Sequence, residues 1–194
     1  MNTQEPAKEV SRFIILVPHR DSLKPVEEYR KRLFAAGFAG AYSFPLSAPL
    51  AVVSRPFSRE ELKALARTIR DFTVSTSGTS GTSGTNGKIL TTERREAIQT
   101  AARCSWLDLP LSLSMDESFF PEATKEKLVS IFSPPTLRVA LVDSGETPPA
   151  REEPPVLSFR AAYLANLIIR PLPAGDPRYS FEWRIGHPVW LPKH

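Results

Sequence analysis

A short apolar run near the N-terminus, Phe13 to Val17, sets the first condition on the fold. The run is rich in β-branched residues and is closed by Pro18. A segment this short and this apolar is typical of a strand buried in the centre of a sheet. The sequence therefore predicts a central strand over residues 13–17.

Nineteen prolines divide the 194 residues into short elements. Pro25 suits the first turn of a helix and Gly37 suits its C-terminal cap, so a helix is expected between them. A second strand is predicted over 50–54. Ser58 and Glu61 then form a capping-box pair that opens a helix with an apolar stripe, ending near residue 72.

The C-terminal half is richer in strand signals. Residues 87–115 mix short strands with a helical turn. Further along we expect a helix over 121–132, a strand over 136–144, a long apolar segment over 156–172 whose alanines allow a helix, and strands over 179–186 and 188–192 with His187 in the turn between them. Interleaved helices and strands predict an α+β or α/β protein with a mixed sheet.

A near-perfect Thr-Ser-Gly repeat occupies residues 75–87. A phosphate-binding Walker loop ends in Gly-Lys-Ser/Thr and leads into a helix, but here Lys88 is followed by Ile89 in a segment typical of a strand. The composition instead predicts a flexible loop. We expect a disordered N-terminus over 1–11 and one domain over 12–192 that contains this loop.

Composition narrows the functional classes. The net charge of +4 permits an anionic partner without requiring one. The single cysteine, Cys104, cannot form an internal disulfide, and we expect a structural thiol. No spacing of ligands predicts a metal site, and no cofactor is implied. A polar N-terminus and the lack of a run of about 20 apolar residues predict a soluble, cytoplasmic protein with no membrane partner.

The order of these elements carries a family resemblance. An N-terminal strand leads to a helix, then to "APLAVVSRPFS" and the capped helix; "KLVSIFSPPTLRVALV" repeats the helix-to-strand unit, and "YSFEWRIGHPVWLP" closes the chain. This order resembles the two-histidine (2H) phosphoesterases, which include the bacterial RNA 2',5'-ligase and cyclic phosphodiesterases. The resemblance covers most of 13–192 and implies an α+β fold of two lobes, with mixed or antiparallel sheets and outer helices.

The same resemblance implies where chemistry would lie. Each lobe of the family carries a His-x-Thr/Ser motif on a central strand, in which one histidine accepts a proton, the other donates one, and the hydroxyls hold the phosphate. The matching positions here are Leu50 and Val52 in the first lobe and Leu137 and Val139 in the second. Apolar side chains neither transfer protons nor bind phosphate. The chain thus resembles a degenerate member without the catalytic residues.

Three polar side chains stand outside that pattern. Arg55 and Arg138 adjoin the degenerate motifs and are candidate anion-binding residues. His19 ends the first strand and is an alternative acid or base, although a loop that caps the next helix is the simpler explanation of it.

Three hypotheses follow. The first is a non-catalytic 2H-like domain with a binding or structural role. The second is a phosphodiesterase acting on RNA ends or cyclic nucleotides, in which His19 works with Arg55 or Arg138. The third is an unrelated α+β interaction domain. The partner class left open is a nucleotide or RNA.

Overall fold

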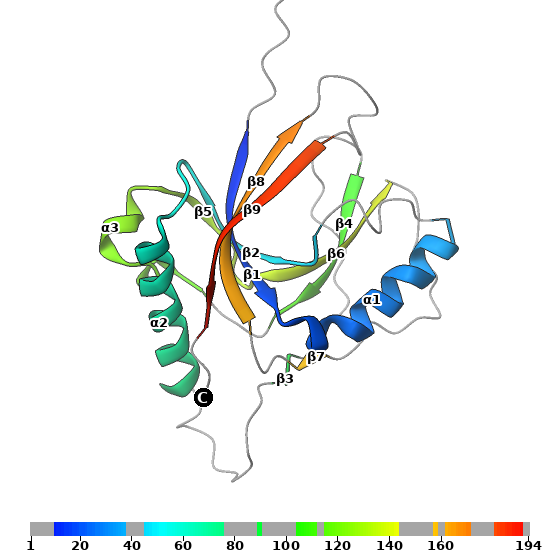
Figure 1. The fold of residues 1–194 in the computed structure, drawn as a ribbon, viewed down its shortest axis with the longest axis horizontal. Helices are drawn as coiled ribbons and strands as arrows, with labels where there is room; N and C mark the ends of the chain where they lie inside the picture. Colours follow the sequence, from blue (N-terminus) through cyan, green and yellow to red (C-terminus); the bar gives the residue numbers. More distant parts are fainter. Residues whose placement is uncertain are drawn as a thin grey trace, which may run out of the picture.

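A computed structural model describes residues 10–37, 45–75, 89–90, 104–111, 115–143, 157–158, 162–171 and 181–191. These residues form an α+β fold in which a five-stranded sheet is accompanied by helices and by two two-stranded sheets (Figure 1). The α+β prediction is confirmed. The repeat loop and the disordered N-terminus that we predicted lie almost wholly outside the described residues, although β1 already begins at residue 11.

The predicted central strand is the middle of the large sheet. Strand β1 (Ser11–Pro18) lies between β2 (Ala48–Val53) and β8 (Ala162–Pro171), and the strand order is β5-β2-β1-β8-β9. The edges are β5 (Leu128–Ile131) and β9 (Phe181–Trp190), and every pairing in this sheet is antiparallel. Because β1 has a partner on each side, its apolar run is buried as a central strand requires.

Two smaller sheets stand beside the large one. Strand β4 (Cys104–Pro110) pairs with β6 (Thr136–Asp143), and β3 (Ile89–Leu90) pairs with β7 (Leu157–Ser158), both antiparallel. A single bridge between Ser47 and Arg138 joins the start of β2 to β6, where the N–H of Arg138 donates to the carbonyl of Ser47 at 3.0 Å. The strand predicted over 136–144 is therefore confirmed, and it lies against β2.

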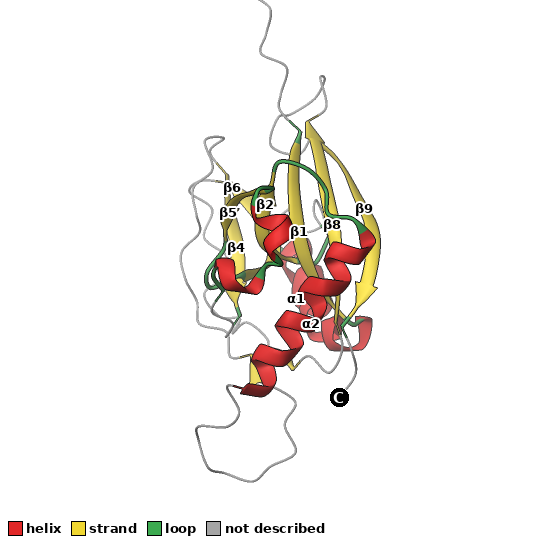
Figure 2. Ribbon diagram, turned by 90° about the vertical axis from the view of Figure 1, so that its left-hand side faces the viewer, coloured by secondary structure: helices red, strands yellow, loops and turns green. Residues whose placement is uncertain are grey.

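The helices lie on two sides of the strands in Figure 1, with α1 (Arg20–Ala35) on the right and α2 (Arg59–Ser75) and the short α3 (Glu122–Lys125) on the left. A 3-10 turn, η3 (Glu117–Phe119), precedes α3. Figure 2 shows the same helices against the strands from the side. Apolar residues of α1 and α2 belong to the main core cluster with β1, β2, β6 and β8. A second, smaller cluster of β1 and β8 residues contains Ile15, Val17, Ala165 and Leu167.

Helix α1 begins earlier than its proline suggested. The helix starts at Arg20, because the ring nitrogen Nδ1 of His19 accepts a hydrogen bond from the N–H of Asp21 and caps the first turn. Pro25 therefore lies inside the helix rather than in its first turn. It removes one backbone donor, since proline has no N–H.

The helix predicted over 121–132 is wrong in its second half, and the long apolar segment that allowed a helix also contains a strand. Helix α3 ends at Lys125, and residues 128–131 form β5, which pairs with β2. The long apolar segment becomes β8, which is paired on both sides by β1 and β9. Leu164, Ala165 and Leu167 in β8 are all fully buried, so burial of both strand faces outweighs the helix propensity of alanine.

The turn predicted at His187 is a bulge within one continuous strand. Strand β9 runs unbroken through this residue and carries His187 and Pro188 opposite Ala165 of β8 alone. His187 has φ of 56°, a left-handed conformation that is uncommon for a residue with a side chain. The extra residue kinks the strand without ending it.

The capping box at the start of α2 is confirmed and is tied to the segment that follows α3. The N–H of Ser58 donates to Oε2 of Glu61 at 2.6 Å, and the N–H of Glu61 donates to Oγ of Ser58 at 3.3 Å. The other oxygen of Glu61 accepts from Nζ of Lys127 at 2.5 Å, and both side chains are mostly buried. Burial alone raises the pKa of Glu61, but the hydrogen bonds from Lys127 and Ser58 outweigh it and lower the pKa below 4.5.

Replacement of Glu61 by glutamine is expected to lower the free energy of unfolding by about 1–2 kcal/mol at pH 7. The contribution of Glu61 is complete above its ordinary pKa of 4.5 and is lost as pH falls through the lower folded pKa. Urea unfolding between pH 7 and pH 3 should therefore show a flatter acid dependence in Glu61→Gln than in the wild type. Parallel curves for the two proteins would contradict this assignment.

Among the described residues no helix combines the length and the apolar character needed to cross a membrane.

Candidate functional site

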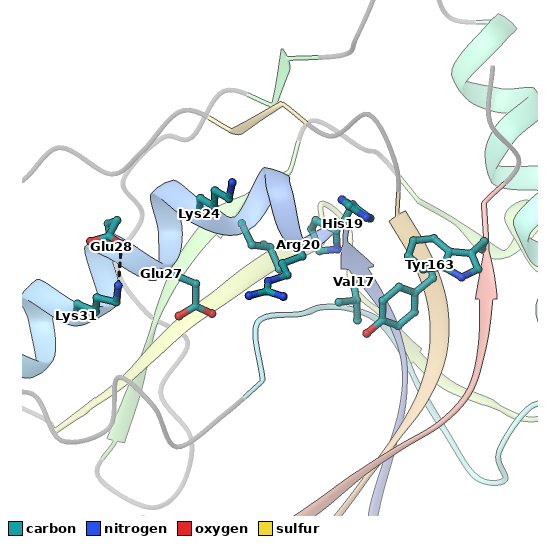
Figure 3. Close-up of a pocket in the computed structure, with 11 residues that line it drawn as sticks. Val17, His19, Arg20, Lys24, Glu27, Glu28, Lys31 and Tyr163 are labelled. Carbon is teal, nitrogen blue, oxygen red and sulfur yellow. Dashed lines mark hydrogen bonds and ion pairs between the residues drawn. The ribbon is translucent and has the colours of Figure 1, made fainter.

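A pocket among the described residues lies where α1 begins, at the ends of β1, β8 and β9. Its volume is about 580 Å³. Figure 3 shows His19 and Tyr163 at one end of it and the charged side chains of α1 along its length. The lining residues are Val17, Pro18, His19, Arg20, Leu23, Lys24, Glu27, Glu28, Lys31, Tyr163 and Trp190.

Three rings form one end of this pocket. The centroid of the Trp190 ring lies 5.2 Å from that of the Tyr163 ring, in an edge-on arrangement, and 5.9 Å from that of the His19 ring. Cross-strand pairing holds the Tyr163 ring against the Trp190 ring, because these two residues are opposite one another on β8 and β9. Trp190 is 57% exposed, so more than half of its surface remains open to solvent beside these two ring contacts. Burial raises the pKa of Tyr163 above its ordinary value. Its hydroxyl can donate a hydrogen bond at neutral pH.

His19 performs two roles at the pocket edge. Its Nδ1 accepts the N–H of Asp21 at 3.3 Å, which requires that nitrogen to carry no proton. The same nitrogen lies 3.5 Å from the Asp21 carboxylate. The ring that caps α1 therefore also contacts Trp190, with an angle of 47° between the two ring planes.

The charged side chains of α1 are mostly paired. Lys31 donates to Glu28 at 2.8 Å, which lowers the pKa of that carboxyl, and Lys24 lies 3.9 Å from Asp21. Within the described part of the chain, Arg20 has no carboxylate within ion-pair distance. Arg20 is exposed and lines the pocket, so it is the cation best placed to meet an anion there.

The degenerate motif positions lie elsewhere, in the protein interior. Leu50 and Leu137 are fully buried and Val139 is 2% exposed, and all three belong to the main core cluster. Val52 is half-buried and lies outside that cluster. Three of the four positions thus pack as core side chains of β2 and β6.

The two candidate cations do not face the pocket. Arg55 is exposed and its guanidinium donates to Glu126 at 3.1 Å. The Arg138 guanidinium lies 5.6 Å from the centre of the Phe13 ring and 5.8 Å from that of Phe132. Cation–π contacts of this kind stabilise the arginine where it is.

His19 is not brought near either arginine. Phe13, which Arg138 covers, is opposite Val52 near the start of β1, whereas His19 follows its last residue. Six residues of extended chain separate Phe13 from His19, which is roughly 20 Å at about 3.3 Å per residue. Arg55 follows β2 at the same far end. The combination of His19 with these arginines is therefore not assembled in this structure.

The other candidate sites in the described part of the chain offer fewer functional groups for binding or catalysis. A smaller pocket of about 210 Å³ is lined at the β9 bulge by Pro56, Asn166, Ile168, Arg184, Gly186 and His187. In the ranges that the structure covers, no three metal-ligating side chains gather closely enough to hold an ion. Cys104 lies in β4, and its side chain is not among those described.

The sequence did not predict the ring cluster. Tyr163 fell in a segment expected to allow a helix, and Trp190 fell in a short closing strand, so their pairing was not visible. The apolar run Leu167–Ile169 contains two β-branched isoleucines and favours a strand over a helix, but it does not indicate that this strand pairs with β9.

No family model matches the chain, and neither a curated protein nor a solved structure is significantly similar to it.

Proposed function

We propose that this chain is a non-catalytic binding domain with the architecture of a degenerate 2H phosphoesterase. The observation that carries the proposal is the packing of Leu50, Leu137 and Val139 in one buried core. A phosphoesterase of that family needs ionisable and hydroxyl groups at these positions, open to substrate. Buried leucine and valine supply neither chemistry nor access.

The two-lobed arrangement is part of this proposal. The two degenerate motifs lie on β2 and β6, which belong to different sheets, and those sheets meet at the bridge between Ser47 and Arg138. This meeting of two motif strands is what two facing lobes would require. The unrelated α+β domain of the third hypothesis would need no such correspondence between the strands.

The pocket beside α1 supplies the binding surface in this proposal. The exposed face of Trp190 offers a stacking platform, the Tyr163 hydroxyl offers a hydrogen-bond donor, and Arg20 offers a positive charge. A planar ring that carries negative charge matches these three features. A nucleotide or the end of an RNA strand is such a ligand.

The test is an assay of turnover and binding with 2',3'-cyclic AMP and a 2',5'-linked dinucleotide. We expect no turnover by the wild type. We expect binding that weakens by about tenfold in Trp190→Ala, since stacking on an aromatic ring contributes about 1–3 kcal/mol per base. Trp183→Ala is the matched control, because Trp183 lies at the other end of β9 and should leave binding unchanged.

His19→Ala separates the remaining outcomes. Turnover by the wild type that disappears in His19→Ala would overturn the non-catalytic proposal in favour of a phosphodiesterase with unusual groups. An absence of both turnover and binding would leave the enzyme hypothesis unsupported and would remove the nucleotide as the ligand of this pocket.

A further inference from the structure

The outer edge of β9 is an unpaired strand edge among the described strands. The large sheet ends at β9, which pairs with β8 on its inner side only (Figures 1 and 2). Strand β9 is ten residues long. An edge of this length presents backbone N–H and carbonyl groups that can pair with another strand.

Along this edge, charged side chains lie on one face of the sheet and an aromatic side chain lies on the other. Glu182 and Arg184 point to one face of the sheet, and Trp183 between them points to the other, because alternate residues of a strand face opposite ways. All three are exposed. In the described part of the chain neither Glu182 nor Arg184 has an ion-pair partner, and Trp183 is 43% exposed.

We propose that β9 pairs with β9 of a second copy of this chain, antiparallel, with Trp183 on the two-fold axis. In this register the two Trp183 side chains are directly opposite one another. Glu182 is then opposite Arg184 of the partner subunit, and Arg184 is opposite Glu182 of the partner subunit. Two cross-strand ion pairs and one aromatic pair therefore form at once.

Charge selects this register over its neighbours. A two-fold axis perpendicular to the sheet leaves corresponding faces of the two sheets on the same side of the joined sheet. The possible registers then differ only in which residue is opposite its own copy at the axis. An axis through Glu182 would place two glutamates opposite each other, and an axis through Arg184 would place two arginines so. An axis through Ile185 would leave both charges without an opposite partner. Like charges opposite one another destabilise a strand pair, and opposite charges stabilise it.

The apolar face continues across the proposed joint. Trp183 is opposite Ile169 on β8, and both lie on the face that carries the second apolar cluster, with Leu167, Ala165 and Ile15. Pairing of two copies would join the two clusters through their Trp183 rings. Burial of exposed aromatic surface then favours the association.

The bulge limits how far the strands can pair. The kink at His187 and Pro188 interrupts the edge, and proline has no N–H to donate. Pairing centred on Trp183 therefore covers five described residues on each strand, from 181 to 185. An interface this small is below the usual size for stable complexes, so we expect a weak, reversible dimer with a Kd of roughly 10–500 μM.

A charge swap tests this proposal by sedimentation velocity from about 5 to about 500 μM. Glu182→Arg and Arg184→Glu each place like charges opposite one another, and each should weaken the dimer by about tenfold. The double variant E182R/R184E restores opposite charges and should dimerise like the wild type. Glu182→Arg and the double variant also place an arginine opposite Arg170 of β8 in the same chain, so thermal unfolding of all four proteins is measured and dimerisation is compared at a temperature where each is folded.

Each other outcome overturns the proposal. A wild type that stays monomeric at the highest concentration would show that β9 does not self-associate. Single variants that dimerise as well as the wild type would show that another surface mediates association. A double variant as weak as the singles would overturn the register centred on Trp183.

Discussion

Replacement of Asn166 by leucine is expected to lower the free energy of unfolding by about 2–4 kcal/mol. Asn166 is 3% exposed and lies on β8. Its side-chain oxygen accepts from the N–H of Phe57 at 2.8 Å, and its amide donates to the carbonyl of Phe57 at 2.7 Å. Since Phe57 is itself buried, both of its backbone groups would lose their partner without gaining water.

The contact also fixes where α2 begins. Phe57 directly precedes the capping residue of α2, so Asn166 ties the entry of that helix to the sheet. Thermal unfolding should show a loss of roughly 5–15 °C for a chain of this size. Ser130→Ala on the exposed edge strand β5 is the control and should change stability by less than about 0.5 kcal/mol. A loss below about 1 kcal/mol in Asn166→Leu would contradict the tether.

Local signals predicted the elements that depend on neighbouring residues. The apolar run of β1 predicted a central strand, because no polar residue interrupts it. Ser58 and Glu61 predicted the start of α2, because the capping box satisfies backbone groups within one turn. In the apolar stripe predicted at Leu62, Leu65, Ile69 and Phe72, the first three residues are buried, and the side chain of Phe72 lies outside the described part of the structure.

Elements that depend on distant partners were not predictable in the same way. Ala162–Pro171 has alanines that suit a helix, but β1 and β9 pair with it on both sides and make it a strand. The segment at 128–131 becomes a strand because β2 pairs with it. Such pairings join residues that are far apart in the sequence, and local propensity does not encode them.

The same distinction between local and distant determinants applies to the residues of the candidate site. Leucine and valine at the motif positions already indicated core residues, and the burial of Leu50, Leu137 and Val139 agrees with that interpretation. His19 was expected to cap a helix or act as an acid or base, and it caps α1. Its contact with Trp190 depends on the pairing of β8 with β9, which brings the C-terminal strand to the N-terminal helix. No spacing within the sequence carries that information.

Burial of the degenerate motif is the central claim, and cysteine labelling measures it directly. Val139 is 2% exposed on β6, and Val129 is 66% exposed on β5, so Val139→Cys and Val129→Cys form a matched pair. Each variant is exposed to a small maleimide under native conditions. Peptide mass spectrometry locates the label, which separates the new thiol from Cys104.

A core position reacts only when the protein opens, whereas a residue in a substrate cleft reacts in the folded state. We expect the introduced thiol of Val139→Cys to react at least about a thousandfold more slowly than that of Val129→Cys, because the free energy of opening a core is several kcal/mol. The difference should disappear in denaturing urea. Labelling of both introduced thiols at similar rates in the native protein would contradict the buried motif and restore an open cleft between β2 and β6.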